Sequence, residues 1–252
     1  LLATSVMGAL AASLLRGRPP PPVAPWRYLL LGGRMAAFFV TMFVALLYTD
    51  PVTAGAVFTL MPLLSAFFGY LFLGQVPRGV VWASLVLAGL GSLWVIFRGD
   101  LDALLAFDVG YGEIIFFFGV AGHAAYAPLV RRLNRGEPVV AFTFWTLAAT
   151  GLCIAVYGVR EILATEWTAL PAIVWAAVVY LAVFTGAGTF FLVQFASMRL
   201  PAAKVLAYSY LTPCIIIVIE GAIGHGWASP SVFVGALITV LGLLILALSR
   251  DG

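Results

Sequence analysis

Three ionisable side chains lie within long apolar stretches of the sequence, where a charge is costly. They are Arg34, His123 and Glu220. Ionisable groups inside a membrane-spanning segment usually face a protein interior and take part in binding solutes or ions. Histidine titrates near neutral pH, and a carboxylate removed from water can do the same. His123 and Glu220 are therefore candidates for proton coupling, whereas the long side chain of Arg34 is more simply explained by reaching to the membrane surface.

Further side chains near His123 and Glu220 can contact a solute. Tyr126 follows His123 by three residues and shares its helix face, so the imidazole can hydrogen-bond a solute or merely a neighbouring carbonyl. Glu220 shares a face with Ser209 and Pro213 but lies roughly 10 Å from mid-span. It either binds a proton or a cationic group, or is an interfacial carboxylate at the outer mouth. Aromatic side chains that can form a wall for a planar or apolar solute are Phe38, Phe39, Tyr208 and Tyr210.

Two prolines near the middle of apolar stretches mark a second kind of site. A proline within a helix removes one backbone hydrogen bond, so Pro62 frees the carbonyl of Phe58 and Pro213 frees that of Ser209. Inside a bilayer a freed carbonyl is tolerated where it lines a wet cavity. Matched breaks in two halves of a chain indicate a solute site, and the alternative is a structural kink packed against its neighbours.

The composition identifies the elements that carry these side chains as membrane helices. Hydrophobic residues make up 63% of the 252 residues, charged residues make up 9%, and the mean hydropathy is +1.12. A soluble domain is nearer half apolar and a quarter charged. The excess predicts lipid-facing surface, so the lipid bilayer is the expected environment. A net charge of +3 without a long basic run argues against nucleic-acid binding.

The apolar stretches divide the chain into helices with short loops. Runs such as Ile215-Ile216-Ile217-Val218-Ile219 do not alternate with polar residues, which argues against a membrane barrel. A shorter apolar run from Leu1 to Leu15 is predicted to be the end of a further helix. The predicted full spans are 27–48, 53–73, 79–97, 112–130, 138–159, 171–197, 203–223 and 230–248.

The loops alternate in charge, which predicts their orientation. Only Arg98 and Arg160 fall on the side that holds most acidic residues. Cytoplasmic loops carry an excess of Lys and Arg. We therefore expect both termini in the cytoplasm and the chain in the inner (cytoplasmic) membrane. The ten basic residues of the other, cytoplasmic side are Arg16, Arg18, Arg27, Arg78, Arg131, Arg132, Arg135, Arg199, Lys204 and Arg250.

The chain repeats itself with a long period. Pro62 lies 151 residues before Pro213, and a small-residue pair at 84 and 91 lies 151 residues before a second pair at 235 and 242. The second copy holds five spans, and because five is odd, two copies in tandem cross the membrane in opposite senses. Inverted-topology repeats are typical of secondary carriers, whose solute site lies at the repeat interface. We predict one transmembrane domain made of repeats at residues 1–100 and 101–252.

The first copy contains only four spans. By the offset between the copies, roughly 40 residues are expected before Leu1, amounting to one helix and part of another. The predicted fold class is therefore an all-α integral membrane bundle of ten helices in two inverted five-helix repeats. About nine of these helices fall within this sequence.

Three stretches carry a resemblance to a known family. They are Val57-Phe58-Thr59-Leu60-Met61-Pro62-Leu63 followed by Leu73-Gly74-Gln75, Gly122-His123-Ala124-Ala125-Tyr126 running to Arg131-Arg132, and Ser209-Tyr210-Leu211-Thr212-Pro213. In their order and spacing the chain resembles the ten-helix EamA-type members of the drug/metabolite transporter superfamily. The resemblance implies a carrier or exporter of metabolites such as amino acids, with a central cavity between the repeats.

The chain also departs from the family pattern. The family has Gly-Glu where this chain has Gly74-Gln75 and His225-Gly226, and a mid-helix Trp where this chain has His123. A substrate-binding set of Phe38, Phe39, Phe58, Pro62, His123, Tyr126, Ser209, Tyr210 and Pro213 is expected for a small-molecule substrate. The sequence is compatible with a monomer and does not define an oligomeric state.

Two other classes compete with a carrier driven by alternating access. A membrane enzyme needs a nucleophile with its base or clustered metal ligands, and the two histidines lie about a hundred residues apart without a His-Glu-x-x-His motif. The phosphate-cradling glycine loop of ATP-driven proteins is absent as well. We expect no catalytic residues, metal site or cofactor. A passive channel-like facilitator fits the same sequence and differs from a carrier in its kinetics.

Overall fold

The computed structural model describes residues 2–17, 19–224 and 226–249. Arg18, His225 and Arg250, which entered the predictions above, lie outside the described residues. The described chain is all-helical, without a strand. Eight of its helices are long and apolar enough to cross a membrane, and the predicted spans match them to within a few residues at each end. They are Pro25–Ala45, Pro51–Leu73, Gly79–Ile96, Tyr111–Leu133, Val139–Tyr157, Ala172–Ser197, Ala202–Ala222 and Pro230–Leu248.

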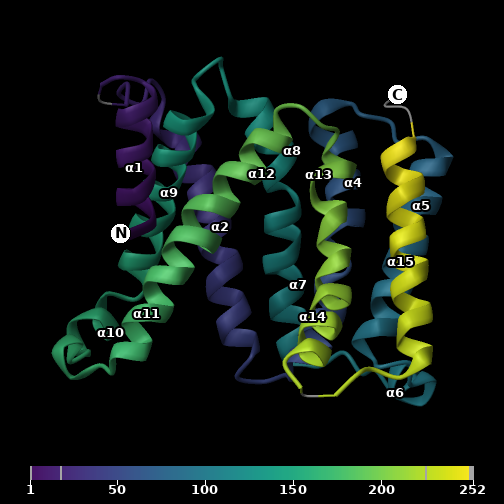
Figure 1. The fold of residues 1–252 in the computed structure, drawn as a ribbon. Helices are drawn as coiled ribbons and strands as arrows, with labels where there is room; N and C mark the ends of the chain where they lie inside the picture. The colour runs from purple at the N-terminus through teal and green to yellow at the C-terminus, as the bar shows by residue number, and fades with distance from the viewer. Residues whose placement is uncertain (1, 18, 225, 250–252) are drawn as a thin grey trace. The chain divides into compact units, whose positions relative to one another are not determined.

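Several of these spans are built from more than one helical segment (Figure 1). In chain order the segments are α1 Leu2–Leu14, α2 Pro25–Ala45, α3 Pro51–Phe58, α4 Met61–Leu73, α5 Gly79–Ile96, α6 Leu101–Leu105, α7 Tyr111–Ala124, α8 Tyr126–Leu133, α9 Val139–Tyr157, α10 Val159–Ala164, the 3₁₀ turn η1 Trp167–Ala169, α11 Ala172–Tyr180, the π-helix η2 Leu181–Gly188, α12 Thr189–Ser197, α13 Ala202–Ala207, the 3₁₀ turn η3 Tyr208–Tyr210, α14 Leu211–Ala222 and α15 Pro230–Leu248.

Both predicted proline breaks are confirmed. In the span of Pro62, α3 ends at Phe58 and α4 begins at Met61. The hydroxyl of Thr59 donates to the carbonyl of Ala56 at this break, at 2.6 Å. In the span of Pro213, the 3₁₀ turn η3 separates α13 from α14. Each break lies within five residues before its proline, because the ring removes a donor and crowds the preceding turn.

The helices form two compact units, whose boundaries fall within α2, within α8 and between α12 and α13. Unit 1 comprises residues up to Val40 together with Leu129–Arg199. Within it α1 lies beside α9 (Figure 1). A Cβ atom on Gly32 of α2 would lie 2.6 Å from the backbone nitrogen of Thr150 in α9, so these two helices approach closely. The Thr143 hydroxyl donates to the side-chain oxygen of Gln194, at 2.6 Å, and joins α9 to α12.

Unit 2 comprises Thr41–Pro128 together with residues from Leu200 onward. Its largest packed pair is α5 with α15, which lie side by side in Figure 1. Small residues allow this approach: a Cβ on Gly91 would lie 2.6 Å from the backbone nitrogen of Thr239, and one on Gly242 would lie 2.7 Å from that of Ala88. Positions on α5 rise as their partners on α15 fall, so the two helices are antiparallel. The small residues identified in the sequence are therefore the residues at this contact.

A second pair in unit 2 joins the start of α13 to α4. The Ser65 hydroxyl donates to the carbonyl of Ala202 at 3.1 Å, and a Cβ on Gly69 would lie 2.8 Å from the Ala202 side chain. The side-chain oxygen of Gln75 accepts the Ala202 backbone N–H, at 3.0 Å. Gln75 therefore satisfies a donor at the first turn of α13, which gives a structural role to one departure from the family pattern.

Candidate functional site

Unit 2 contains a cavity of about 860 Å³ that lies against both proline-broken spans. Most of its wall is apolar. Its residues come from the end of α2 and from α3, α5, α7, η3, α14 and the start of α15, with the loops beside them. The lining residues are Met42, Leu46, Pro51, Val52, Ala54, Gly55, Phe58, Thr59, Ser92, Val95, Ile96, Arg98, Phe116, Ser209, Tyr210, Thr212, Pro213, Ile216, Ile217, Glu220, Gly226, Trp227, Ala228, Ser229 and Val232.

The cavity extends from the helix breaks to the interhelical loops. One end, here called the inner end, lies at Ser209 and Tyr210 beside the break before Pro213. The other end is here called the loop end. It lies at Arg98, which follows α5, and at Trp227, which precedes α15. Ser209 and Glu220 are separated along their span by roughly 16 Å at 1.5 Å per residue. The two ends are therefore farther apart than the length of a typical amino acid.

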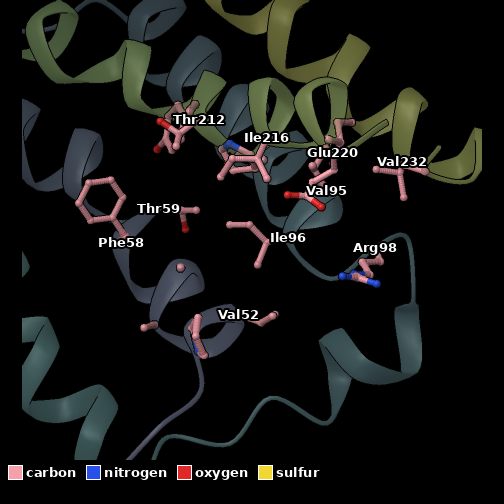
Figure 2. A pocket seen from close by; sticks show the side chains of 18 of the residues that line it. Val52, Phe58, Thr59, Val95, Ile96, Arg98, Thr212, Ile216, Glu220 and Val232 are labelled. Carbon is pink, nitrogen blue, oxygen red and sulfur yellow. The ribbon is translucent and has the colours of Figure 1, made fainter. Parts of the chain in front are cut away.

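The loop end carries both charged groups found among the described lining residues. Figure 2 shows Glu220 and Arg98 on the side of the cavity formed by Val95 and Ile96, across from Phe58. Arg98 adopts a left-handed backbone conformation with φ of 54°, which is uncommon for a residue other than glycine. This conformation ends α5: the Arg98 N–H donates to the carbonyl of Val95 and the Gly99 N–H donates to that of Trp94. A carboxylate and a guanidinium on one wall can bind groups of both charges.

The inner end carries hydroxyls with unused hydrogen-bonding capacity. The oxygens of Ser92, Ser209 and Tyr210 are buried and have no hydrogen-bond partner within the part of the chain that the structure describes. The residues Ser92 and Tyr210 are each 1% exposed. A Cβ on Gly89 would lie 3.1 Å from the Tyr210 hydroxyl, so that oxygen lies against α5 one turn before Ser92. Leaving such a group unsatisfied costs about 1–3 kcal/mol.

Five of the predicted site residues meet in this cavity. They are Phe58, Ser209, Tyr210, Pro213 and Glu220. Pro62 is buried in α4 and is not among the lining residues. His123 and Tyr126 pack edge to face with ring centroids 6.3 Å apart, also outside the cavity wall.

We expected four residues to border one opening, namely Pro62, Pro213, His123 and Tyr126. Of these four, only Pro213 lines this cavity. Phe38 and Phe39 lie in unit 1, with ring centroids 5.5 Å apart. A contact of these two phenylalanines, Pro62, His123 or Tyr126 with solute stays a prediction.

Sequence reasoning missed Ser92, Arg98 and Trp227. Arg98 had a usable signal, since it is one of two basic residues on the acidic side of the predicted topology. Ser92 lies in α5 among other small residues and had none. Trp227 lies in the loop before α15, and its ring approaches α14 at Gly221, where a Cβ would lie 2.5 Å from it. The rotation of a helix about its axis decides which residues reach a cavity. In a membrane both lipid and protein contact apolar side chains, so the spacing of apolar residues gives little information about this rotation.

A second, smaller hollow of about 620 Å³ in unit 2 contains three carboxylates, Asp50, Asp108 and Glu113. Asp50 accepts the backbone N–H groups of Val52 and Thr53, and Glu113 accepts the hydroxyl of Thr49 and the N–H of Gly110. Asp50 therefore caps α3, and Glu113 caps α7. Among the described residues no group of three or more His, Cys, Asp or Glu side chains is placed to hold a metal ion.

Known proteins relate to this chain by sequence and by fold. A Bacillus subtilis (strain 168) protein, described as the uncharacterized transporter YyaM, is 26% identical over 207 residues, which cover 82% of this chain and 68% of that protein. A solved crystal structure of a protein with 22% sequence identity matches the fold with a TM-score of 0.76, over 98% of this chain and 86% of the other. The family model described as the EamA-like transporter family matches residues 1–97 and 110–248. The chain is therefore a multi-pass membrane protein that belongs to the EamA-like transporter family.

Proposed function

We propose that this protein is a secondary transporter that moves a small organic metabolite, an amino acid or a similar solute, through the cavity of unit 2. The observation that carries the proposal is the cavity itself. Its volume of about 860 Å³ falls in the range of roughly 300–1,000 Å³ that small-molecule sites occupy. The residues at the Pro213 break line its inner end, and Arg98 and Glu220 line its loop end.

The charges favour a solute that carries both an amino and a carboxylate group. The Arg98 guanidinium presents a planar set of donors suited to a carboxylate. The Glu220 carboxylate can accept from an ammonium group, and the apolar wall around Phe58 and Ile216 suits an apolar side chain. This combination matches an amino acid better than a simple inorganic ion.

The membrane orientation adds a direction of access. The loop end of the cavity adjoins Asp50, Asp100 and the loop after α14, all on the acidic side of the predicted topology. By the positive-inside rule this side faces away from the cytoplasm. The protein then lies in the cytoplasmic membrane with both termini in the cytoplasm, and this cavity receives solute from outside. Carriers built from inverted repeats alternate access between the two sides, which we propose here too.

Counterflow in proteoliposomes tests the function. Vesicles loaded with an unlabelled amino acid should accumulate the same labelled amino acid at a rate that saturates with concentration. Non-saturating flux would support a channel-like facilitator, and the lack of any flux across a panel of amino acids would contradict the proposed solute class. Arg98→Gln should raise the half-saturation concentration, whereas Arg160→Gln, at an exposed position in α10, should not.

Protons are the proposed coupling partner, with Glu220 or His123 as the titrating group. Uptake measured with and without a pH gradient decides between coupling and facilitated diffusion. If protons are coupled, the gradient should accelerate the native protein, and Glu220→Gln or His123→Ala should abolish the acceleration. Equal rates with and without the gradient in the native protein would remove proton coupling.

A further inference from the structure

The connection between α9 and α11 contains a short amphipathic helix, α10. Its large apolar side chains are Val159, Ile162 and Leu163, and its charged ones are Arg160 and Glu161. Spacings of three and four residues put the apolar side chains on one helix face and the charged ones on the opposite face. The apolar face is not covered by the rest of the described chain, since its three side chains are 47%, 40% and 80% exposed.

The position of α10 in the chain places it at the surface of the membrane. The span of α9 ends at Tyr157, α10 begins at Val159, and the next span begins at Ala172. Figure 1 shows α10 beyond the end of α9, in the chain that leads to α11. Tyr157 in the last turn of α9 and Ile173 in the first turn of α11 are also exposed. The apolar face of α10 therefore continues the lipid-facing surface of the two spans that it connects.

Two tryptophans link this connection to the start of α11. The indole N–H of Trp167, in η1, donates to the carbonyl of Ile162 in α10 at 3.0 Å. The ring of Trp167 also lies against that of Trp175 in α11, with ring centroids 6.3 Å apart. Both tryptophans remain more than 40% exposed. Tryptophan is enriched where the hydrocarbon of a membrane meets its polar surface, because the ring is apolar and its N–H needs a partner.

We infer that α10 lies in the interface between lipid headgroups and acyl chains, with Val159, Ile162 and Leu163 toward the acyl chains. Its partner is thus the surface of the bilayer itself. The connection 158–171 contains one arginine and two glutamates, so it has no excess of positive charge to attract anionic lipids. Burial of the apolar face is then the driving force, and zwitterionic lipid is sufficient.

Spin labels on the two faces of α10 test this placement. The full chain, with Cys153 and Cys214 replaced by Ala, receives a nitroxide at Leu163→Cys or, as the matched control, at Glu161→Cys, and is placed in phosphatidylcholine vesicles. Oxygen concentrates among acyl chains, whereas a nickel chelate stays in water. The ratio of oxygen to nickel collisions should be severalfold higher at position 163 than at 161. The label at 163 should lie about 5–10 Å below the headgroup boundary.

Each other outcome overturns the inference. Equal, frequent nickel collisions at both positions would place α10 in water. Protection of position 163 from both oxygen and nickel would mean that protein, rather than lipid, covers the apolar face. A label at 163 that reaches the acyl chains only after anionic phosphatidylglycerol is added would contradict burial driven by the apolar face. These measurements need no solute, so a failure of the proposed transport would leave them unaffected.

Discussion

At the scale of single residues, unit 1 holds a buried ion pair near the start of α2. Arg27, fully buried, donates to the carboxylate of Glu137 at 2.5 Å and to the carbonyl of Leu133 at 2.5 Å. Burial alone would raise the pKa of Glu137, but hydrogen bonds from Arg27 and from the backbone N–H of Arg135 hold this pKa below its ordinary value. The pair joins α2 to the loop between α8 and α9.

Removing one member of this pair should cost more than removing both. Glu137→Ala leaves the Arg27 charge buried without its carboxylate and should destabilise the protein by about 3–5 kcal/mol. Replacement of both residues by Met should cost less, because no uncompensated charge remains. Thermal unfolding in detergent ranks the native protein, Glu137→Ala and the double variant by stability. A double variant less stable than Glu137→Ala would contradict it.

The same pair should make stability depend on pH. A carboxylate with a lowered pKa in the folded state contributes its stabilisation above the ordinary carboxylate range. The contribution is lost as the pH falls through that range toward the folded-state pKa. The melting temperature of the native protein should therefore fall more steeply below about pH 4.5 than that of the double Met variant.

Asp50 lies on the acidic side of the predicted membrane topology, where it caps α3. Its carboxylate accepts the side-chain hydroxyl of Thr53 and the backbone N–H groups of Thr53 and Val52, and these hydrogen bonds lower its pKa. Asp50→Ala should cost about 1 kcal/mol, the usual value of an N-cap, and Asp50→Asn should recover most of it. The loss should be present at neutral pH and shrink as acid protonates the native carboxylate. Equal melting temperatures for native and Asp50→Ala proteins would contradict the capping role.

At the scale of elements, much of the architecture was accessible from the sequence. The eight spans and the two proline breaks follow from apolar run length and from proline chemistry, both of which are local properties. The π-helical turn from Leu181 to Gly188 was not predicted. Two hydroxyls donate to carbonyls of their own helix there, Thr185 to Leu181 and Thr189 to Phe184. A π-helical segment has no periodic pattern of apolar residues by which the sequence could predict it.

The cavity wall was predicted only in part, for a physical reason. Glycine, serine and apolar residues alternate along α5 without a polar face, so the sequence did not reveal that Ser92 lies in the cavity wall while Ser84 bonds to its own helix. The break before Pro213 did reveal its neighbours Ser209 and Tyr210. Local chemistry thus predicted the lining residues at a helix break. The other lining residues depend on how each helix is rotated about its axis, which the sequence does not show.

The contact between α5 and α15 should tolerate no added volume at Gly91. A Cβ there would lie 2.6 Å from the Gly235 carbonyl oxygen and from the Thr239 nitrogen, and backbone atoms cannot rotate away. Gly91→Ala should therefore cost about 1–3 kcal/mol through overpacking. Gly79→Ala, at the first turn of the same helix, meets nothing within 4 Å and should be neutral. Equal stability of the two variants would show that the helices separate freely.

At the scale of the whole molecule, the antiparallel α5–α15 pair supports the predicted duplication. Gly91 of α5 lies against Thr239 of α15. The residue 151 positions after Gly91 is Gly242, the residue 151 positions before Thr239 is Ala88, and these two also lie against each other. Contacts that exchange in this way are self-complementary, as around a two-fold axis. The two segments matched by the family model, 1–97 and 110–248, divide the chain near the predicted boundary between repeats. Two inverted repeats at 1–100 and 101–252 remain our proposal.

The predicted topology can be tested by the sidedness of single cysteines. On a background with Cys153 and Cys214 replaced by Ala, Val76→Cys and Arg135→Cys should react with a membrane-impermeant thiol reagent only after cells are permeabilised. Asp102→Cys and Glu166→Cys should react in intact cells. The native residues at all four positions are exposed and lie between spans, so accessibility depends on the side of the membrane.

Each outcome of this labelling bears on a different part of the topology. Ten basic residues on one side and two on the other predict that the loop of Val76 is cytoplasmic. Complete reversal of the labelling would invert the orientation and place the cavity's loop end in the cytoplasm, while the antiparallel pairing of α5 with α15 would still stand. Reaction of Val76→Cys and Asp102→Cys from the same side would mean that α5 does not span the membrane. That result would remove the inverted repeat, because a repeat with an even number of crossings preserves its direction.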